Sequence, residues 1–309
     1  MTHRRLGIDV GGTKCHGVVL ADDGEVVGEH RVPTPHGADA IVDALAGVAS
    51  ELGPFDSIGV GVPGLVTRAG VVRASPNLVD VVDFDVARRL SDRLGVAVEV
   101  DNDATCAAAA EWVIGAGRGV DDMVMVTLGT GIGGGIVAAG RLVRGVNGFA
   151  GEIGHMVLEP DGPECPCGRR GCWERYASGS GLAHLARAAI LAGRGDRVLE
   201  LAAGDLASVR GEHVQAAARE GDPGALEVVD QFGRWVAIGL ANLTNLLDPG
   251  MLVLGGGLAT AADLYLPPIE RWFAASLYSA DLRPRPAVRF ALLGPRAGAI
   301  GAALLPELR

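Results

Sequence analysis

The chain of 309 residues is 49% hydrophobic and 21% charged, with a formal net charge of −10. This composition provides enough apolar side chains for a large buried core and excludes a disordered chain. Aromatic residues make up only 4%. Their scarcity and the acidic charge argue against a nucleic-acid binder, which needs stacking side chains or a basic face. The length fits two α/β domains with a shared cleft.

Two segments that could be mistaken for targeting signals have simpler explanations. Residues 1–5 are basic, but residues 6–10 lead into acidic and glycine-rich sequence without the apolar region of a signal peptide. Residues 123–140 carry no charge, yet their six glycines and two threonines favour a strand and a loop over a membrane span. We therefore expect a cytoplasmic protein with neither a membrane nor a nucleic-acid partner.

Strand and helix patterns alternate along the chain. The first half predicts strands at 6–10, 17–20, 25–28, 57–62 and 97–100, and helices at 41–52, 85–94 and 104–113. After a glycine-rich stretch the pattern restarts, with strands at 123–128 and 251–254, an irregular segment at 155–175, and helices at 223–247 and near 295–305. This alternation predicts an α/β fold with two sheets. The apolar stripe of the long helix fits ordinary core or, less well, part of an interface.

Three glycine-rich segments each follow a predicted strand: Asp9-Val10-Gly11-Gly12-Thr13-Lys14, Leu128-Gly129-Thr130-Gly131-Ile132-Gly133-Gly134-Gly135, and Gly255-Gly256-Gly257. Glycine lets backbone N–H groups approach a phosphate closely, Thr13 adds a hydroxyl donor, and Asp9 could hold Mg²⁺ directly or through water. Each segment alone is also compatible with a tight turn. Together they indicate a nucleotide in the cleft between two α/β halves.

Three of the five cysteines lie within eight residues, at Cys165, Cys167 and Cys172. His155, ten residues upstream of this cluster, completes a set of four nitrogen and sulfur ligands. Such a set predicts a structural zinc site, with unpaired thiols in a loop as the alternative. Cys15 and Cys106 each stand alone in apolar sequence, so we expect them to be buried thiols.

Asp101-Asn102-Asp103 lies between a predicted strand and a predicted helix. One of its carboxylates could cap the helix. The carboxyl end of a strand is also where α/β proteins place working groups, and phosphoryl transfer to a hydroxyl needs a carboxylate that accepts its proton. We assign that role to Asp103, with Asn102 orienting the acceptor. Carboxylates, imidazole and amide groups near the metal segment and in the loop 75–78 could bind the hydroxyls of a polyol.

At these motifs the sequence resembles the ROK family (repressors, open reading frames, kinases) and, within it, the bacterial ATP-dependent glucokinases. The matching features run from about residue 6 to residue 301, and the most specific are Glu152-Ile153-Gly154-His155 and Cys165-x-Cys167-Gly168-x-x-Gly171-Cys172-x-Glu174. The resemblance implies an α/β, two-domain, actin-like (ribonuclease H-like) ATPase fold with an interdomain cleft that holds the sugar. We expect a smaller domain of residues 1–115, completed by the C-terminal helix 296–309, and a larger domain of residues 116–295.

The resemblance also implies a role for each motif. Asp103 would be the general base toward the sugar 6-hydroxyl. The sugar-binding residues would be Gly64, Asn77, Asn102, Asp103, Glu152, His155 and Glu174. ATP and Mg²⁺ would be bound by Asp9, Gly11, Gly12, Thr13, Lys14, Thr130, Gly131, Gly133, Gly255, Gly256 and Gly257. Structural Zn²⁺ would be held by His155, Cys165, Cys167 and Cys172, with the second ring nitrogen of His155 directed at the sugar.

The function expected from this resemblance is phosphorylation of glucose by ATP, with a hexose and a nucleotide as small-molecule partners and a homo-oligomeric (dimer or tetramer) state. The alternatives are a kinase for another hexose (N-acetylmannosamine, fructose or mannose), a sugar-sensing repressor, and a non-catalytic sugar-binding ATPase. A repressor would need an N-terminal DNA-binding domain, whereas the first glycine-rich motif here begins at Asp9. The candidate base and both phosphate loops favour the kinase over a non-catalytic protein.

Overall fold

The computed structural model describes residues 3–75, 77–78 and 81–308. The first sheet has five strands in the order β3-β2-β1-β4-β8. Their bounds are β1 Arg5–Val10, β2 Lys14–Leu20, β3 Val26–Pro33, β4 Ser57–Val62 and β8 Val98–Asn102. The predicted strands are thereby confirmed, and β2 and β3 pair as an antiparallel hairpin.

Three of these strands run parallel, so their carboxyl ends meet at one edge of the sheet. In the register, Asp9 of β1 lies beside Gly61 of β4, and Gly61 lies beside Asp101 of β8. The helix α3 (Asp103–Val113) begins directly after β8. The parallel register therefore places Asp9 and the segment 101–103 at the same edge.

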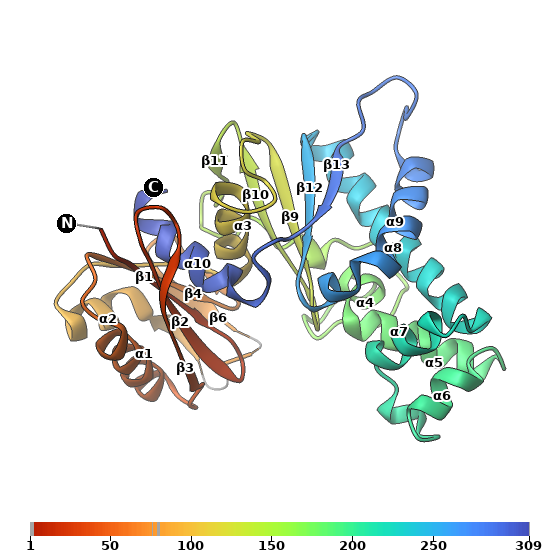
Figure 1. Ribbon diagram of the computed structural model, residues 1–309, viewed down its shortest axis with the longest axis horizontal. Helices are drawn as coiled ribbons and strands as arrows, with labels where there is room; N and C mark the ends of the chain where they lie inside the picture. Colours follow the sequence, from red (N-terminus) through yellow and green to blue (C-terminus); the bar gives the residue numbers. More distant parts are fainter. Residues whose placement is uncertain (1–2, 76, 79–80, 309) are drawn as a thin grey trace. The chain divides into compact units, whose positions relative to one another are not determined.

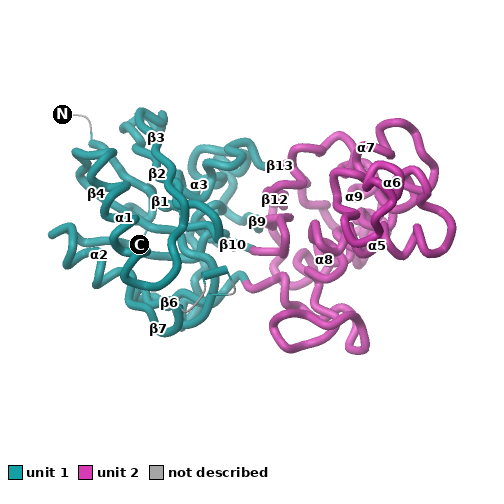
Figure 2. The backbone as a smooth tube through the Cα atoms, turned by 90° about the horizontal axis from the view of Figure 1, so that it is seen from below, with its two compact units in different colours: residues 1–125, 134–151, 291–309 teal, residues 126–133, 152–290 magenta. Residues whose placement is uncertain are grey.

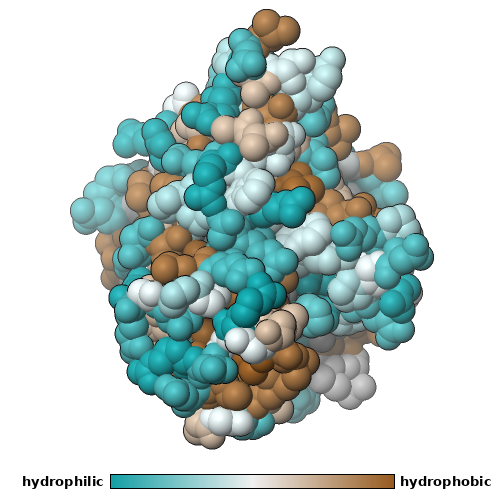
Figure 3. All heavy atoms as spheres, turned by 90° about the vertical axis from the view of Figure 1, so that its right-hand side faces the viewer, coloured by the Kyte–Doolittle hydropathy of each residue, from teal (hydrophilic) through white to brown (hydrophobic). Residues whose placement is uncertain are grey.

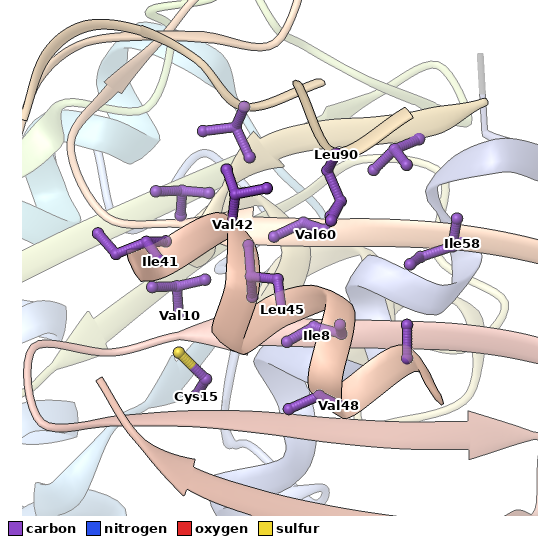
Figure 4. Close-up of a cluster of buried hydrophobic side chains, with 14 of the residues drawn as sticks. Ile8, Val10, Cys15, Ile41, Val42, Leu45, Val48, Ile58, Val60 and Leu90 are labelled. Atoms are coloured by element: carbon purple, nitrogen blue, oxygen red, sulfur yellow. The ribbon is translucent and has the colours of Figure 1, made fainter. Parts of the chain in front are cut away.

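The two faces of this sheet are covered differently. Helices α1 (Ala38–Leu52) and α2 (Val86–Leu94) cover one face with a core of aliphatic side chains, and the buried thiol of Cys15 lies within it (Figures 1 and 4). The C-terminal helix α10 (Ala297–Leu304) covers the other face together with α3. Its approach is very close, because a Cβ on Gly7 would lie 1.9 Å from the carbonyl oxygen of Ala299.

A small three-stranded sheet was not expected from the sequence. It has the order β5-β6-β7, and its strands are β5 Leu65–Val66, β6 Val71–Ala74 and β7 Val82–Asp85. Strands of two to four residues are too short to show a hydrophobic period, which explains why the pattern gave no sign of them.

The second five-stranded sheet has the order β11-β10-β9-β12-β13. Its strands are β9 Met123–Leu128, β10 Ile132–Ala138, β11 Arg141–Leu142, β12 Met251–Gly255 and β13 Ala287–Phe290. The helices of the second half are α4 Glu174–Ala177, α5 Gly179–Leu191, α6 Asp196–Leu201, α7 Gly211–Arg219, α8 Pro223–Leu247 and α9 Ala262–Ser276. The uncharged stretch 123–140 is thus strand and loop, as predicted.

The long helix α8 forms as its signals predict. The Asp222 carboxylate accepts a hydrogen bond from the Ala225 N–H, and Pro223 occupies the first turn. Phe232, Val236 and Leu240 are fully buried along its stripe. The apolar stripe predicts burial along its whole length, but Leu226 and Leu247 at its two ends are exposed. The helix packs against α5, α7 and α9 and serves mainly as core.

The chain divides into two compact units, coloured in Figure 2. Unit 1 comprises residues 1–125, 134–151 and 291–309, and unit 2 comprises residues 126–133 and 152–290. The units have other boundaries than the domains expected at 1–115 with 296–309 and at 116–295, and that division stays a prediction. The chain passes from one unit to the other four times.

The surface and the helices give two further findings. On the face shown in Figure 3, hydrophobic residues form small groups separated by hydrophilic ones. Within residues 3–75, 77–78 and 81–308, no helix has both the length and the apolar character needed to cross a membrane. The homo-oligomeric state stays a prediction.

Candidate active site

In unit 1, the carboxylate of Asp9 and the backbone of Asp103 both lie close to Gly61. A Cβ on Gly61 would lie 3.4 Å from the Asp9 Oδ1 and 3.5 Å from the Asp103 Cα. On the other side of Asp9, a Cβ on Gly298 of α10 would approach the carboxylate to 2.7 Å. Glycines thus leave room for two acidic groups at the ends of parallel strands, and neither glycine was singled out from the sequence.

The electrostatics of this pair suit proton transfer. The pKa of Asp9 is raised to about 7, chiefly by burial and also by the Asp103 carboxylate, while Lys14 acts in the opposite direction. Burial also raises the pKa of Asp103, although the Ala104 N–H and the Asn102 side chain act in the opposite direction. A carboxylate with a raised pKa accepts a proton more readily from a hydroxyl, so Asp103 has the character of a general base.

The helix that begins at Asp103 is capped by an amide rather than a carboxylate. The Asn102 Oδ1 accepts hydrogen bonds from the N–H groups of Ala104 (2.9 Å) and Thr105 (3.1 Å). The Asn102 Nδ2 donates to the carbonyl oxygen of Gly64 at 3.1 Å. Gly64 has a φ of +107°, and a Cβ there would lie 2.2 Å from the Ala74 carbonyl oxygen, so only glycine fits. The cap fixes Asn102, and the Asp103 Oδ1 accepts a further hydrogen bond from the Ala104 N–H at 2.8 Å.

The first glycine loop is the tight turn between β1 and β2. The Gly11 N–H donates to the Lys14 carbonyl oxygen at 2.9 Å, and the Thr34 hydroxyl donates to the Gly11 carbonyl oxygen at 2.7 Å. Gly12, Thr13 and Lys14 are exposed. Asn77 lies beside this turn, since a Cβ on Gly12 would be 3.5 Å from the Asn77 Cβ. The turn is therefore held firmly while its outer face stays open to a ligand.

In unit 2, the second and third glycine loops lie side by side. Gly256 has a φ of +83°, and a Cβ there would lie 2.5 Å from the Leu128 carbonyl oxygen at the end of β9. Gly257 follows it in open space, with no atom within 4 Å of a Cβ built there. Only glycine allows the ends of β9 and β12 to approach this closely.

The N-terminus of α5 joins the second loop, which the sequence gave no reason to expect. The Gly179 N–H donates to the Gly129 carbonyl oxygen at 2.7 Å, and the Ser180 hydroxyl donates to the Thr130 carbonyl oxygen at 2.9 Å. Inside the loop, the Gly133 N–H donates to the Thr127 Oγ1 at 3.1 Å. These bonds fix the loop that carries Thr130, Gly131 and Gly133.

The four residues predicted to bind zinc come together in unit 2. One ligand atom from each of His155, Cys165, Cys167 and Cys172 lies within 4.8 Å of every other. The Cys167 and Cys172 Sγ atoms are 3.6 Å apart, close to the spacing of about 3.8 Å between two sulfurs on one tetrahedral zinc. A set of three thiols and one imidazole is a donor set that zinc prefers, so the residues fit the metal.

Three candidate sugar-binding groups surround this cluster. The His155 Nδ1 lies 3.8 Å from the Cys165 Sγ, and its Nε2 lies 3.9 Å from the Glu152 Oε2. One ring nitrogen thus faces the cluster and the other faces a carboxylate. The Glu174 Oε1 accepts from the Cys165 thiol at 3.1 Å, and its Oε2 accepts from the Ile132 N–H at 3.4 Å. Glu174 therefore connects the metal cluster to the second glycine loop.

The cluster rests on a fully buried tryptophan that sequence reasoning did not single out. Trp173 lies between Cys172 and Glu174 in the chain, and its indole N–H donates to the Trp235 carbonyl oxygen at 2.9 Å. A Cβ on Gly239 of α8 would lie 2.0 Å from the indole ring. Helix α8 thereby anchors the segment that carries Cys172 and Glu174.

The chain is similar to known proteins over nearly its whole length. The model of the ROK family matches residues 5–308. A glucokinase from Streptomyces coelicolor is 39% identical over 304 residues, which cover 96% of both chains. An N-acetylmannosamine kinase from Escherichia coli is 31% identical over 312 residues, 98% of both chains.

A solved structure extends the likeness to three dimensions. The crystal structure of a ROK family glucokinase from Streptomyces griseus in complex with glucose and AMPPNP has a TM-score of 0.87 and 38% identity, covering 98% of both chains. This likeness confirms the expected α/β, actin-like two-domain fold. The chain belongs to the ROK family.

Proposed function

We propose that this protein is an ATP-dependent hexose kinase that phosphorylates the 6-hydroxyl of glucose to give glucose 6-phosphate and ADP. The observation that carries the proposal is the pair of buried carboxylates at the strand ends of unit 1, in a chain similar over nearly its whole length to glucokinases. The Streptomyces relatives are glucokinases, which supports glucose as the acceptor. Phosphorylation of N-acetylmannosamine is the second candidate, because the Escherichia coli relative carries that name.

Asp103 acts on the acceptor hydroxyl. Its carboxylate takes the proton of the sugar 6-hydroxyl while the oxygen forms a bond to the γ-phosphorus of ATP and the bond from that phosphorus to the β–γ bridging oxygen breaks. The electron pair of the broken bond leaves with ADP. Because burial raises the pKa of Asp103, the carboxylate is a stronger base than an ordinary aspartate.

The glycine loops supply backbone N–H groups and space for the nucleotide. In unit 1 the exposed turn Gly11–Lys14 is directed to phosphate, with the Thr13 hydroxyl and the Lys14 ammonium as further donors. In unit 2 Thr130, Gly131 and Gly133 serve the phosphates and Gly255, Gly256 and Gly257 the adenosine. Asp9 would hold Mg²⁺ directly or through water, and that cation would neutralise the charge of the phosphates.

The remaining hydroxyls of the sugar are assigned to Gly64, Asn77, Asn102, Glu152, His155 and Glu174. Asn102 is fixed by its capping bonds and by its bond to Gly64. His155, Cys165, Cys167 and Cys172 would hold a structural Zn²⁺, whose role is to fix the tautomer and the direction of the imidazole. A carboxylate and an imidazole side by side provide the paired acceptor and donor that adjacent hydroxyls require.

A coupled assay across a panel of hexoses, each with ATP and with inorganic polyphosphate, tests the proposal. We expect glucose with ATP to give the highest kcat/KM. A preference for N-acetylmannosamine would select the second candidate, and turnover with polyphosphate alone would replace ATP as the donor. Absence of phosphoryl transfer to any hexose would contradict the proposed function.

A further inference from the structure

Arg144 and Asp101 form a buried ion pair, and Asp101 precedes the candidate base Asp103 by two residues in the chain. The Arg144 Nε donates to the Asp101 Oδ2 at 2.6 Å, and the side chains are 17% and 8% exposed. The other oxygen of this carboxylate, Oδ1, accepts from the N–H of Asn102 at 2.8 Å. Asp101 thus joins Arg144 on one side to the backbone of the residue that precedes Asp103 on the other.

Arg144 itself is fixed by two further parts of unit 1. Its Nη1 donates to the Leu308 carbonyl oxygen at 3.1 Å, and its own carbonyl oxygen accepts from the Ala150 N–H at 3.2 Å. The segment between Arg144 and Ala150 packs tightly, since Gly148 has a φ of +99° and a Cβ there would lie 2.5 Å from the Val66 carbonyl oxygen. The guanidinium of Arg144 is therefore held in a fixed position.

We propose that Arg144 is a positioning residue for the phosphoryl transfer: by holding the Asp101 carboxylate, it fixes Asn102 and the first turn of α3 and so sets the direction of the Asp103 carboxylate. The inference rests on the proposed function for its effect on catalysis. Nearly all the free rotation of Asp101 is removed, because both of its oxygens are engaged. A displacement of about 1 Å at a reacting group can cost about 100-fold in rate.

The surroundings of the pair make it unusually open to chemical testing. A cavity of about 340 Å³ lies beside it, lined by Arg68, Glu99, Arg144 and Leu305 among others. Truncation of Arg144 to alanine enlarges this cavity instead of forming a sealed void. A guanidinium ion is small enough to enter it, and it carries the planar N–H donors that Asp101 loses.

The experiment compares Arg144→Ala with Arg5→Ala, measured far below their melting temperatures with the hexose that the wild type phosphorylates best. Arg5 is the matched control, because its buried guanidinium also reaches the C-terminal segment, donating to Glu307 at 2.9 Å, but it lies at the opposite end of β1 from Asp9. We expect Arg144→Ala to lower kcat about 10- to 100-fold, and Arg5→Ala to lower the Tm with little change in kcat. Guanidinium ions at sub-denaturing concentration should restore kcat several-fold in Arg144→Ala only, with sodium chloride as the salt control.

Two additions make every outcome decisive. Arg144→Lys keeps the positive charge but not the forked donors, so it carries the kinetic test if the alanine variant does not fold, with kcat below that of the wild type at unchanged fold. Hydrogen exchange at residues 102–105 should be faster in the Arg144 variants than in Arg5→Ala, and this readout needs no kinase activity. Unchanged exchange there, or equal kcat losses in Arg144→Ala and Arg5→Ala without rescue, would overturn the inference, whereas an inactive wild type would contradict only the proposed function.

Discussion

The candidate functional groups of the two units differ in kind. In unit 1 the working groups are carboxylates at the ends of parallel strands, and burial raises the pKa of both Asp9 and Asp103. In unit 2 they are glycine loops and a cluster of three thiols and an imidazole. One unit buries acidic groups at a cost in stability, whereas the other brings together glycine loops and four residues that could hold a metal ion. Under the proposed function, unit 1 serves proton transfer and unit 2 serves orientation of the ligands.

The largest effect expected is on catalysis through unit 1. Replacement of Asp103 by asparagine removes the proton acceptor but keeps the shape, so kcat should fall about 10²- to 10⁴-fold while the affinity for the sugar changes little. Steady-state kinetics and calorimetric titration with glucose measure the two quantities. If turnover stays near normal, the base lies elsewhere and the contrast between the units fails.

Loss of the metal from unit 2 should weaken sugar binding and lower stability, whereas loss of the base in unit 1 should lower kcat. Cys167→Ser removes one ligand from the cluster, so we expect loss of zinc, a lower Tm, and a rise of about tenfold or more in the KM for the sugar. Metal analysis, thermal unfolding and kinetics measure these changes, with Cys15→Ala as a control that alters stability but leaves the zinc content intact. A purified wild type without zinc would contradict the assignment.

The acidic pair should make stability depend on pH. Burial raises the pKa of Asp9 to about 7 from an unfolded value of 3.8, so the folded state holds the proton more tightly. The contribution of Asp9 is fully present below about pH 4 and is lost as the pH rises through about 7, at a cost of up to about 4 kcal/mol.

Asp9→Asn should remove this dependence. The stability of Asp9→Asn relative to the wild type should therefore be greater at about pH 8 than at about pH 5. Urea unfolding without added magnesium measures the difference. A constant offset between the two proteins at both pH values would show that Asp9 is not buried in the way described.

The smallest effect expected concerns the paired glycine loops of unit 2. Gly256→Ala forces a side chain into a positive φ and against Leu128, which should cost about 1–3 kcal/mol and raise the KM for ATP several-fold with little change in the KM for the sugar. Gly204→Ala is the matched control, because Gly204 has a similar φ of +78° but a Cβ there meets open space. Equal behaviour of the two variants would argue that the approach of the loops is unimportant for nucleotide binding.

Local signals explain which parts of this site could be predicted. The hydrophobic pattern shows the strand ends at which Asp9 and Gly255 lie. Three thiols within eight residues predict a metal site without any knowledge of the fold. The helix α9 gave no such signal, because Pro267 and Pro268 lie inside it. The pairing of Arg144 with Asp101 spans 43 residues and depends on how the strands are ordered. Contacts of that kind follow from tertiary structure alone.

The packing of α10 has a consequence for the order in which the molecule can form. Gly7 of β1 and Gly59 of β4 leave no space for side chains, because a Cβ would lie 1.9 Å from the Ala299 carbonyl oxygen and 2.0 Å from that of Ala302. A ribosome synthesises residues 291–309 after all of unit 2. On that face the sheet that carries Asp9 is therefore covered only by α3 until synthesis reaches α10, so β1 can complete its packing only after unit 2 has been made.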